Sequence, residues 1–195
     1  TIITKSIFSD KVEGVTLYNF VRFFTKPYYY QPLIRSIVVC SLTVLTSTLI
    51  GVPIAYVLTR YNVPGKQLVH ILIIMSLMSP PFIGAYSWIL LLGRSGVITK
   101  SLLSIGLDIG SIYGFKGILL VQSLKFFPLV FIYMNGAFKN IDNTLMEASA
   151  NMGCTGVRRL FKVVLALSMP TILAAGLMVF MQAFADFGTP MLMGE

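Results

Sequence analysis

Three long stretches without a charged side chain limit what this chain can fold into. Residues 36–59, 69–92 and 163–185 contain no Asp, Glu, Lys or Arg. At a rise of about 1.5 Å per residue, each stretch can cross a hydrocarbon core about 30 Å thick as an α-helix. The chain of 195 residues is 56% hydrophobic and only 11% charged, whereas soluble domains are about one quarter charged. We therefore predict an all-α membrane protein.

A fourth apolar segment, 117–138, has Lys125 as its only charge. The predicted spans are therefore about 36–59, 69–92, 117–138 and 163–185. Residues 1–32 are predicted to be an extracytoplasmic lead-in, with an amphipathic helix near residues 15–24 at the membrane interface. Because the chain begins at Thr1 and ends shortly after the fourth span, we expect a fragment of a longer protein.

Each predicted span contains a proline, and Pro53 lies late in the first. Adjacent prolines near the middle of the second span remove two backbone donors, so that helix should bend or break there. Bent helices suit a gated translocation path, and ordinary kinked packing is the alternative explanation. The four candidate kink positions are Pro80, Pro81, Pro128 and Pro170.

Polar side chains in or beside the spans are candidates for a translocation path. A charge inside a membrane is usually functional, which singles out Lys125, but its long side chain could also extend to the membrane interface. Gln182 and Asp186 are neighbours at helical spacing at the end of the fourth span. They could line a path, and a solvated residue at the helix exit is the simpler interpretation of Asp186.

The polar segment 139–162 has its own helix signals. Thr144 and Glu147 have the spacing of a capping box at a helix start. Gly153 can end that helix in a left-handed conformation, and Thr155 can cap a second helix that continues into the fourth span. We predict two short helices joined by a glycine turn at the membrane surface.

This segment resembles a known motif. Glu147-Ala148-Ser149, three residues, Gly153, nine residues and then Val163-Val164-Leu165-Ala166 is similar to the EAA loop of binding-protein-dependent ABC importer permeases. That pattern is Glu-Ala-Ala, three residues, Gly, nine residues, Ile-x-Leu-Pro. Ser149 replaces the second alanine, and Ala166 replaces the proline, a task that Pro170 could take over one turn later.

The resemblance implies the type I importer fold, with residues 33–195 as a partial permease domain and 139–162 as its cytoplasmic coupling loop. It implies that Glu147, Ala148 and Gly153 belong to a helix pair that docks on a cytoplasmic ABC ATPase dimer. Glu147 could cap its helix, contact the ATPase, or do both. Arg158 and Arg159 could meet acidic ATPase surface or anionic lipid.

The resemblance also implies partners and a mechanism. A solute-binding protein outside the cell would deliver solute, and a second permease domain, fused or separate, would complete the pore in a bacterial plasma membrane. Transport would proceed by alternating access. ATP and Mg²⁺ would bind the ATPase, so this chain would not be an enzyme and would bind no cofactor directly.

Two short phrases resemble the ferric-iron branch of these permeases, namely Gly51-Val52-Pro53-Ile54-Ala55-Tyr56 and Ala185-Asp186-Phe187-Gly188-Thr189-Pro190. They imply ferric iron as the solute, with polyamine, sulfate and phosphonate permeases as relatives of similar layout.

Other classes fit the sequence less well. The net charge of +8 comes from scattered basic residues, which suits lipid head groups at the span ends better than nucleic acid. Two cysteines and one histidine form no metal cluster, and no catalytic set is present, which disfavours a membrane-embedded enzyme. An ion-coupled secondary transporter remains the alternative, but it would need several paired charges inside the spans.

Overall fold

The computed structural model describes residues 8–9, 12–15, 23–78, 80–93, 96–104 and 113–193. The chain forms two compact units, Thr1–Val38 and Val39–Glu195. In the first unit, β1 (Phe8–Ser9) and β2 (Val12–Val15) pair antiparallel, a small hairpin that the sequence did not predict. Val15 therefore lies in a strand and not in the expected interfacial helix near 15–24, and residues 16–22 of that prediction lie outside the described residues.

The rest of the described chain is helical. Its elements are α3 (Pro27–Arg60), which begins in the first unit, α4 (Lys66–Leu77), α5 (Pro81–Leu92), α6 (Val97–Ser104), α7 (Phe115–Lys139), α8 (Asn143–Asn151), α9 (Gly156–Arg159), the π-helix η1 (Leu160–Val164), α10 (Leu165–Ala185) and α11 (Gly188–Met193).

The second predicted span differs from the other three. Among the described residues, three helices are long and apolar enough to cross a membrane, and they are Pro27–Arg60, Phe115–Lys139 and Gly156–Ala185. At 69–92 the chain forms two helices of 12 residues each, α4 and α5, so the predicted bend or break near the middle of the second span is a break. The break falls at Pro80 and Pro81, whose missing backbone donors prevent a continuous helix. In contrast, α7 and α10 continue through Pro128 and Pro170.

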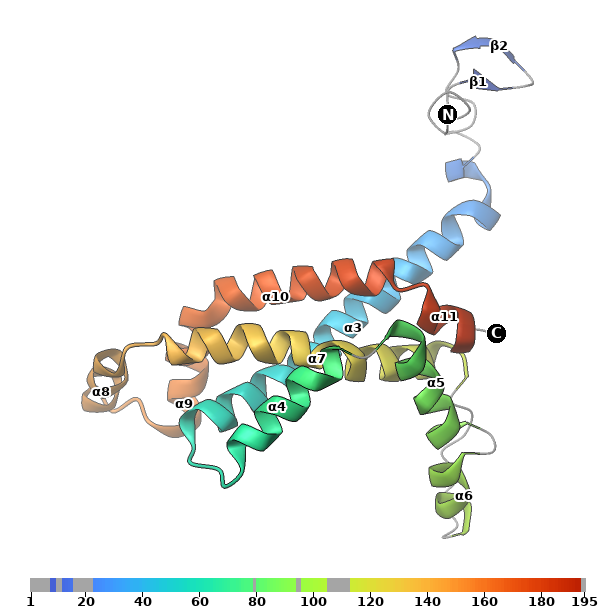
Figure 1. The fold of residues 1–195 in the computed structure, drawn as a ribbon. Coiled ribbons are helices and arrows are strands. Elements are labelled where there is room, and N and C mark those ends of the chain that lie inside the picture. Colours follow the sequence, from blue (N-terminus) through green and yellow to red (C-terminus); the bar gives the residue numbers. More distant parts are fainter. Residues whose placement is uncertain are drawn as a thin grey trace. The chain divides into compact units, whose positions relative to one another are not determined.

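The core of the second unit is centred on α7, which packs against α4, α10 and α11. Figure 1 shows α7 and α10 lying side by side, with α8 and α9 near one end and α11 near the other. Val130, Phe131 and Met134 of α7 are fully buried. They belong to a cluster with buried residues of α3, α4, α8 and α10, so the short loop helix α8 is part of the same core.

Close packing and hydroxyl groups join α3 to α7. Thr43 donates a hydrogen bond to Gln122 over 3.0 Å, and Thr59 donates to Asn135 over 3.1 Å. Between them, a Cβ atom added to Gly51 would lie 2.9 Å from the Phe127 carbonyl oxygen. A glycine lets two membrane helices approach this closely, and interhelical hydrogen bonds then hold them.

Candidate functional site

The N-cap of the loop helix α8 lies two residues before the predicted one. Asp142 is the N-cap, and its side chain accepts a hydrogen bond from the Thr144 N–H over 2.9 Å. The predicted capping box of Thr144 and Glu147 is therefore wrong, because Asp142 supplies the acceptor and Thr144 is already inside the helix. The hydrogen bonds from Thr144 lower the pKa of the Asp142 carboxyl, because they favour its charged form.

Gly153 ends α8 as predicted, with a φ of 76°. The Gly153 N–H donates to the Ala150 carbonyl and the Cys154 N–H donates to the Ser149 carbonyl, both over 2.9 Å. This pair of bonds is a Schellman motif, which satisfies the last carbonyls of a helix and favours glycine at the left-handed position. The chain then turns into α9, whose N-cap is Thr155, although the Thr155 side chain makes no capping hydrogen bond.

The helix pair buries one side and exposes another. Met146 and Ser149 point into the protein. Glu147 and Ala148 are exposed. Large apolar side chains are also exposed on this loop and the turn that follows, namely Leu145, Met152 (87% exposed), Val157 (70%) and Phe161. We call α8, α9 and their turn, residues 143–159, the loop knob.

The loop knob is connected to the long helices at both sides. Arg60, at the end of α3, donates from Nη1 to the Asn143 side-chain oxygen over 3.4 Å. The Arg60 Nε and Nη2 atoms and the Arg159 Nε atom are buried without a hydrogen-bond partner in the described part of the chain. On the other side, α9, η1 and α10 form one continuous helical stretch, Gly156–Ala185.

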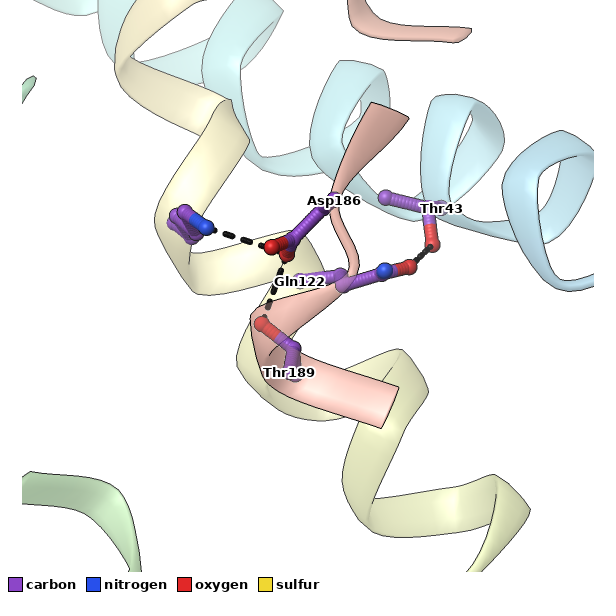
Figure 2. Close-up of polar contacts among 5 residues, drawn as sticks. Thr43, Gln122, Asp186 and Thr189 are labelled. Atoms are coloured by element: carbon purple, nitrogen blue, oxygen red, sulfur yellow. Dashed lines mark hydrogen bonds and ion pairs between the residues drawn. The ribbon is translucent and has the colours of Figure 1, made fainter. Parts of the chain in front are cut away.

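The structure brings together two of the predicted path residues. Lys125 Nζ of α7 lies 3.0 Å from Asp186 Oδ2, at the end of α10. Thr189 of α11 donates to the same carboxylate oxygen over 2.6 Å, and Figure 2 shows this bond together with the Thr43–Gln122 contact. The Asp186 side chain is only 4% exposed, so the expectation of a solvated exit residue is wrong. The Lys125 side chain ends at Asp186, because a buried carboxylate needs a partner.

Lys125, Gln182 and Asp186 all line a cavity of about 980 Å³ bounded by α4, α5, α7 and the end of α10. We call it the α4–α10 cavity. Its walls are mostly apolar, and Pro80, at the break between α4 and α5, is part of them. A largely apolar cavity with a few polar groups has the composition of a small-molecule site.

Some residues of these sites were not predicted from the sequence. Thr189 follows Asp186 by three residues, a spacing that permits a local hydrogen bond, so it could have been found. Arg60 and Asn143 are 83 residues apart, and no local signal pairs them. In the described ranges, no three His, Cys, Asp or Glu side chains are grouped as a metal site would require.

The family described as "Binding-protein-dependent transport system inner membrane component" matches residues 47–195. In Haemophilus influenzae, similar proteins include putative ferric transport system permease protein FbpB 1 (29% identical over 89% of this chain). Others are molybdenum transport system permease protein ModB (32% over 75%) and spermidine/putrescine transport system permease protein PotB (26% over 92%).

The chain spans 28% of the length of FbpB 1, 63% of ModB and 64% of PotB. The family match covers most of the chain and includes α7, the loop knob and α10. The chain therefore belongs to the family of inner membrane components of binding-protein-dependent transport systems, and it is a multi-pass protein of the bacterial plasma membrane.

Proposed function

We propose that this chain is part of the permease subunit of an ATP-driven ABC importer. In this proposal, the loop knob is the surface through which movement of the ATPase reaches the membrane helices. The observation that carries this proposal is a compact helix pair with exposed apolar side chains, continuous with a long helix. Exposed apolar groups such as Met152 and Val157 on a polar loop mark a protein contact. A stiff helical connection can transmit a rigid-body movement of that partner to α10.

In this proposal, a cytoplasmic ABC ATPase dimer docks on the loop knob. Glu147 and Ala148 contribute to the exposed docking surface, and Gly153 sets the angle between α8 and α9. Arg158 and Arg159 face acidic ATPase surface or anionic lipid. ATP and Mg²⁺ bind to the ATPase, which carries out hydrolysis, and this chain binds no cofactor directly.

The remaining parts follow the family resemblance. A solute-binding protein delivers solute outside the cell, and a second permease domain, fused or separate, completes the pore. ATP binding and hydrolysis then alternate its access. We propose ferric iron as the solute, supported by the similarity to FbpB 1. A polyamine, sulfate or phosphonate, or the molybdenum named for ModB, is the alternative.

Co-purification tests the docking proposal. The full-length protein is expressed with an ABC ATPase encoded beside its gene, and ATPase binding and ATP hydrolysis are measured. We expect Met152→Asp and Gly153→Leu to weaken binding about tenfold or more, as loss of a central docking contact does, and Glu147→Ala to reduce stimulation. Thr144→Ala is the control, because Asp142 caps α8. Normal binding and stimulation with both Met152→Asp and Gly153→Leu would contradict the proposal.

An ion-coupled secondary transporter is the second candidate, favoured by the Lys125–Asp186 pair. That class requires several such pairs, and this is the one ion pair recorded among the described residues. Uptake into proteoliposomes that is driven by an ion gradient, without ATPase or ATP, would support this candidate over the importer.

A further inference from the structure

Two side chains of opposite charge line the α4–α10 cavity, and they differ in how far they are exposed. Lys125 and Asp186 both line it. The Asp186 side chain is 4% exposed, whereas that of Lys125 is 23% exposed. Asp186 Oδ2 is already bound by the Lys125 ammonium and by the Thr189 hydroxyl. The charge that a ligand can reach is therefore mainly the positive one.

The Lys125 ammonium has hydrogen-bonding capacity left for a ligand. An ammonium carries three N–H donors and no acceptor, and Asp186 occupies one of them. The same Nζ atom lies 5.2 Å from the centre of the Phe126 ring, which helps to stabilise a positive charge. Lys125 is thus held at the cavity wall from two sides and keeps donors for another group.

The other polar groups of the cavity are compatible with a ligand rich in acceptors. Trp88 and Gln182 line the cavity and carry N–H donors. The hydroxyl hydrogens of Ser76 and Ser87 are used within their own helices, on the carbonyl oxygens of Ile73 and Ile83, each over 2.7 Å. The remaining walls are mostly apolar. Two opposite charges attract each other more strongly beside apolar walls than in water.

We propose that the α4–α10 cavity is a solute site for a small anion that presents negatively charged oxygen atoms to Lys125. The class includes a free oxyanion and a metal ion enclosed in an anionic, oxygen-rich chelator. A polycation or a bare metal cation would meet the ammonium first. This inference rests on the proposed importer function and narrows its solute to anionic forms.

Equilibrium dialysis of the full-length protein in lipid nanodiscs tests this site with four labelled probes, which are molybdate, ferric citrate, citrate and spermidine. Two variants separate charge from folding. Lys125→Arg keeps the cation, whereas the double variant Lys125→Met/Asp186→Asn removes both charges and leaves no unpaired buried ion. Lys116→Met, at the exposed start of the same helix, is the matched control.

We expect molybdate or ferric citrate to bind to the wild-type protein, to Lys125→Arg and to Lys116→Met. Binding should weaken about tenfold or more in the double variant, as expected for loss of a charged hydrogen bond. Binding of molybdate alone identifies a free oxyanion as the ligand. Binding of ferric citrate but not citrate identifies a chelated metal, and equal binding of citrate identifies the chelator's carboxylates.

Three results would overturn the site. They are spermidine binding to the wild-type protein that the double variant weakens, anion binding that the double variant leaves unchanged, and no anion binding by the wild-type protein at millimolar concentration. The same preparation is tested for ATPase association. If the ATPase associates and no anion binds, the solute site is wrong and the importer function stands, whereas failure to associate counts against the importer function itself.

Discussion

Asp186 depends on a residue far away in the sequence. Its carboxylate is nearly inaccessible and is held by Lys125 of α7 and Thr189 of α11. A buried charge that loses its partner is costly, whereas removing both charges can be nearly neutral. The pair therefore fixes the corner between α10 and α11 against α7, whether or not a solute binds there.

At the scale of single residues, we predict that Lys125→Met lowers the free energy of unfolding by about 3 kcal/mol, the usual cost of breaking one side of a buried pair. The double variant Lys125→Met/Asp186→Asn should recover most of that loss. Denaturant unfolding in mixed micelles measures both. A single variant as stable as the wild-type protein would show that the pair does not hold the corner.

Gly51 gives a second prediction for a single residue. Its added Cβ would lie 2.9 Å from both the Phe127 carbonyl oxygen and Val130 Cβ, so α3 and α7 would have to separate. We predict that Gly51→Ala destabilises the protein by about 1–3 kcal/mol through overpacking. Gly136→Ala, in α7 with nothing within 4 Å of the added Cβ, should not, and equal effects in thermal unfolding would contradict the argument.

At the scale of the element, α8 depends on Asp142 and not on Thr144. Replacing Asp142 by Ala removes the acceptor for the Thr144 N–H and should speed amide hydrogen exchange in the first turn of α8 several-fold, since an N-cap stabilises its helix. Thr144→Ala should leave that exchange nearly unchanged. The reverse order of effects would restore Thr144 as the cap.

The same cap should depend on pH. Because folding lowers the pKa of Asp142, its stabilising effect is fully present above the ordinary carboxyl pKa of about 3.9. It is lost as the pH falls through the lower pKa of the folded state. Hydrogen exchange in the first turn of α8 should therefore lose its protection only in this acidic range, and Asp142→Asn should remove the pH dependence.

Local signals determined how well the elements could be predicted. The apolar runs predicted the long helices, and the prolines at 80 and 81 predicted the break, because both effects act within a few residues. Gly153 was predictable because a left-handed turn favours glycine. The cap was assigned wrongly because Asp142 and Thr144 are two residues apart and both are good capping residues.

At the scale of the whole molecule, pairs distant in sequence decide the site. Lys125 and Asp186 each stood out as polar residues near apolar spans, but nothing local in the sequence shows that they meet. The Arg60–Asn143 contact connects residues 83 positions apart. Such pairings depend on how α3, α7 and α10 pack, and sequence periodicity does not determine that.

The two native cysteines allow a test of membrane orientation. Cys40 is buried, whereas Cys154, in the turn of the loop knob, is partly accessible. We predict that a membrane-impermeant maleimide labels Cys154 in inside-out vesicles and not in intact cells, because the proposed docking side is cytoplasmic. Met191→Cys in a Cys154→Ser background, at an exposed position of α11 beyond the other end of α10, should show the opposite pattern. Labelling of Cys154 from outside would reject the proposed orientation.

The π-helix η1 determines which side of the following helix, α10, faces the core. The Leu165 N–H donates to the Leu160 carbonyl, so this turn holds one residue more than an α-helical turn. Each residue rotates an α-helix by about 100°. Deleting the exposed Lys162 would therefore swing Val179 and Ala183 out of the core or rewind the loop knob. Replacing the Lys162 side chain should therefore be tolerated, whereas removing the residue should misalign the loop knob with the buried face of α10.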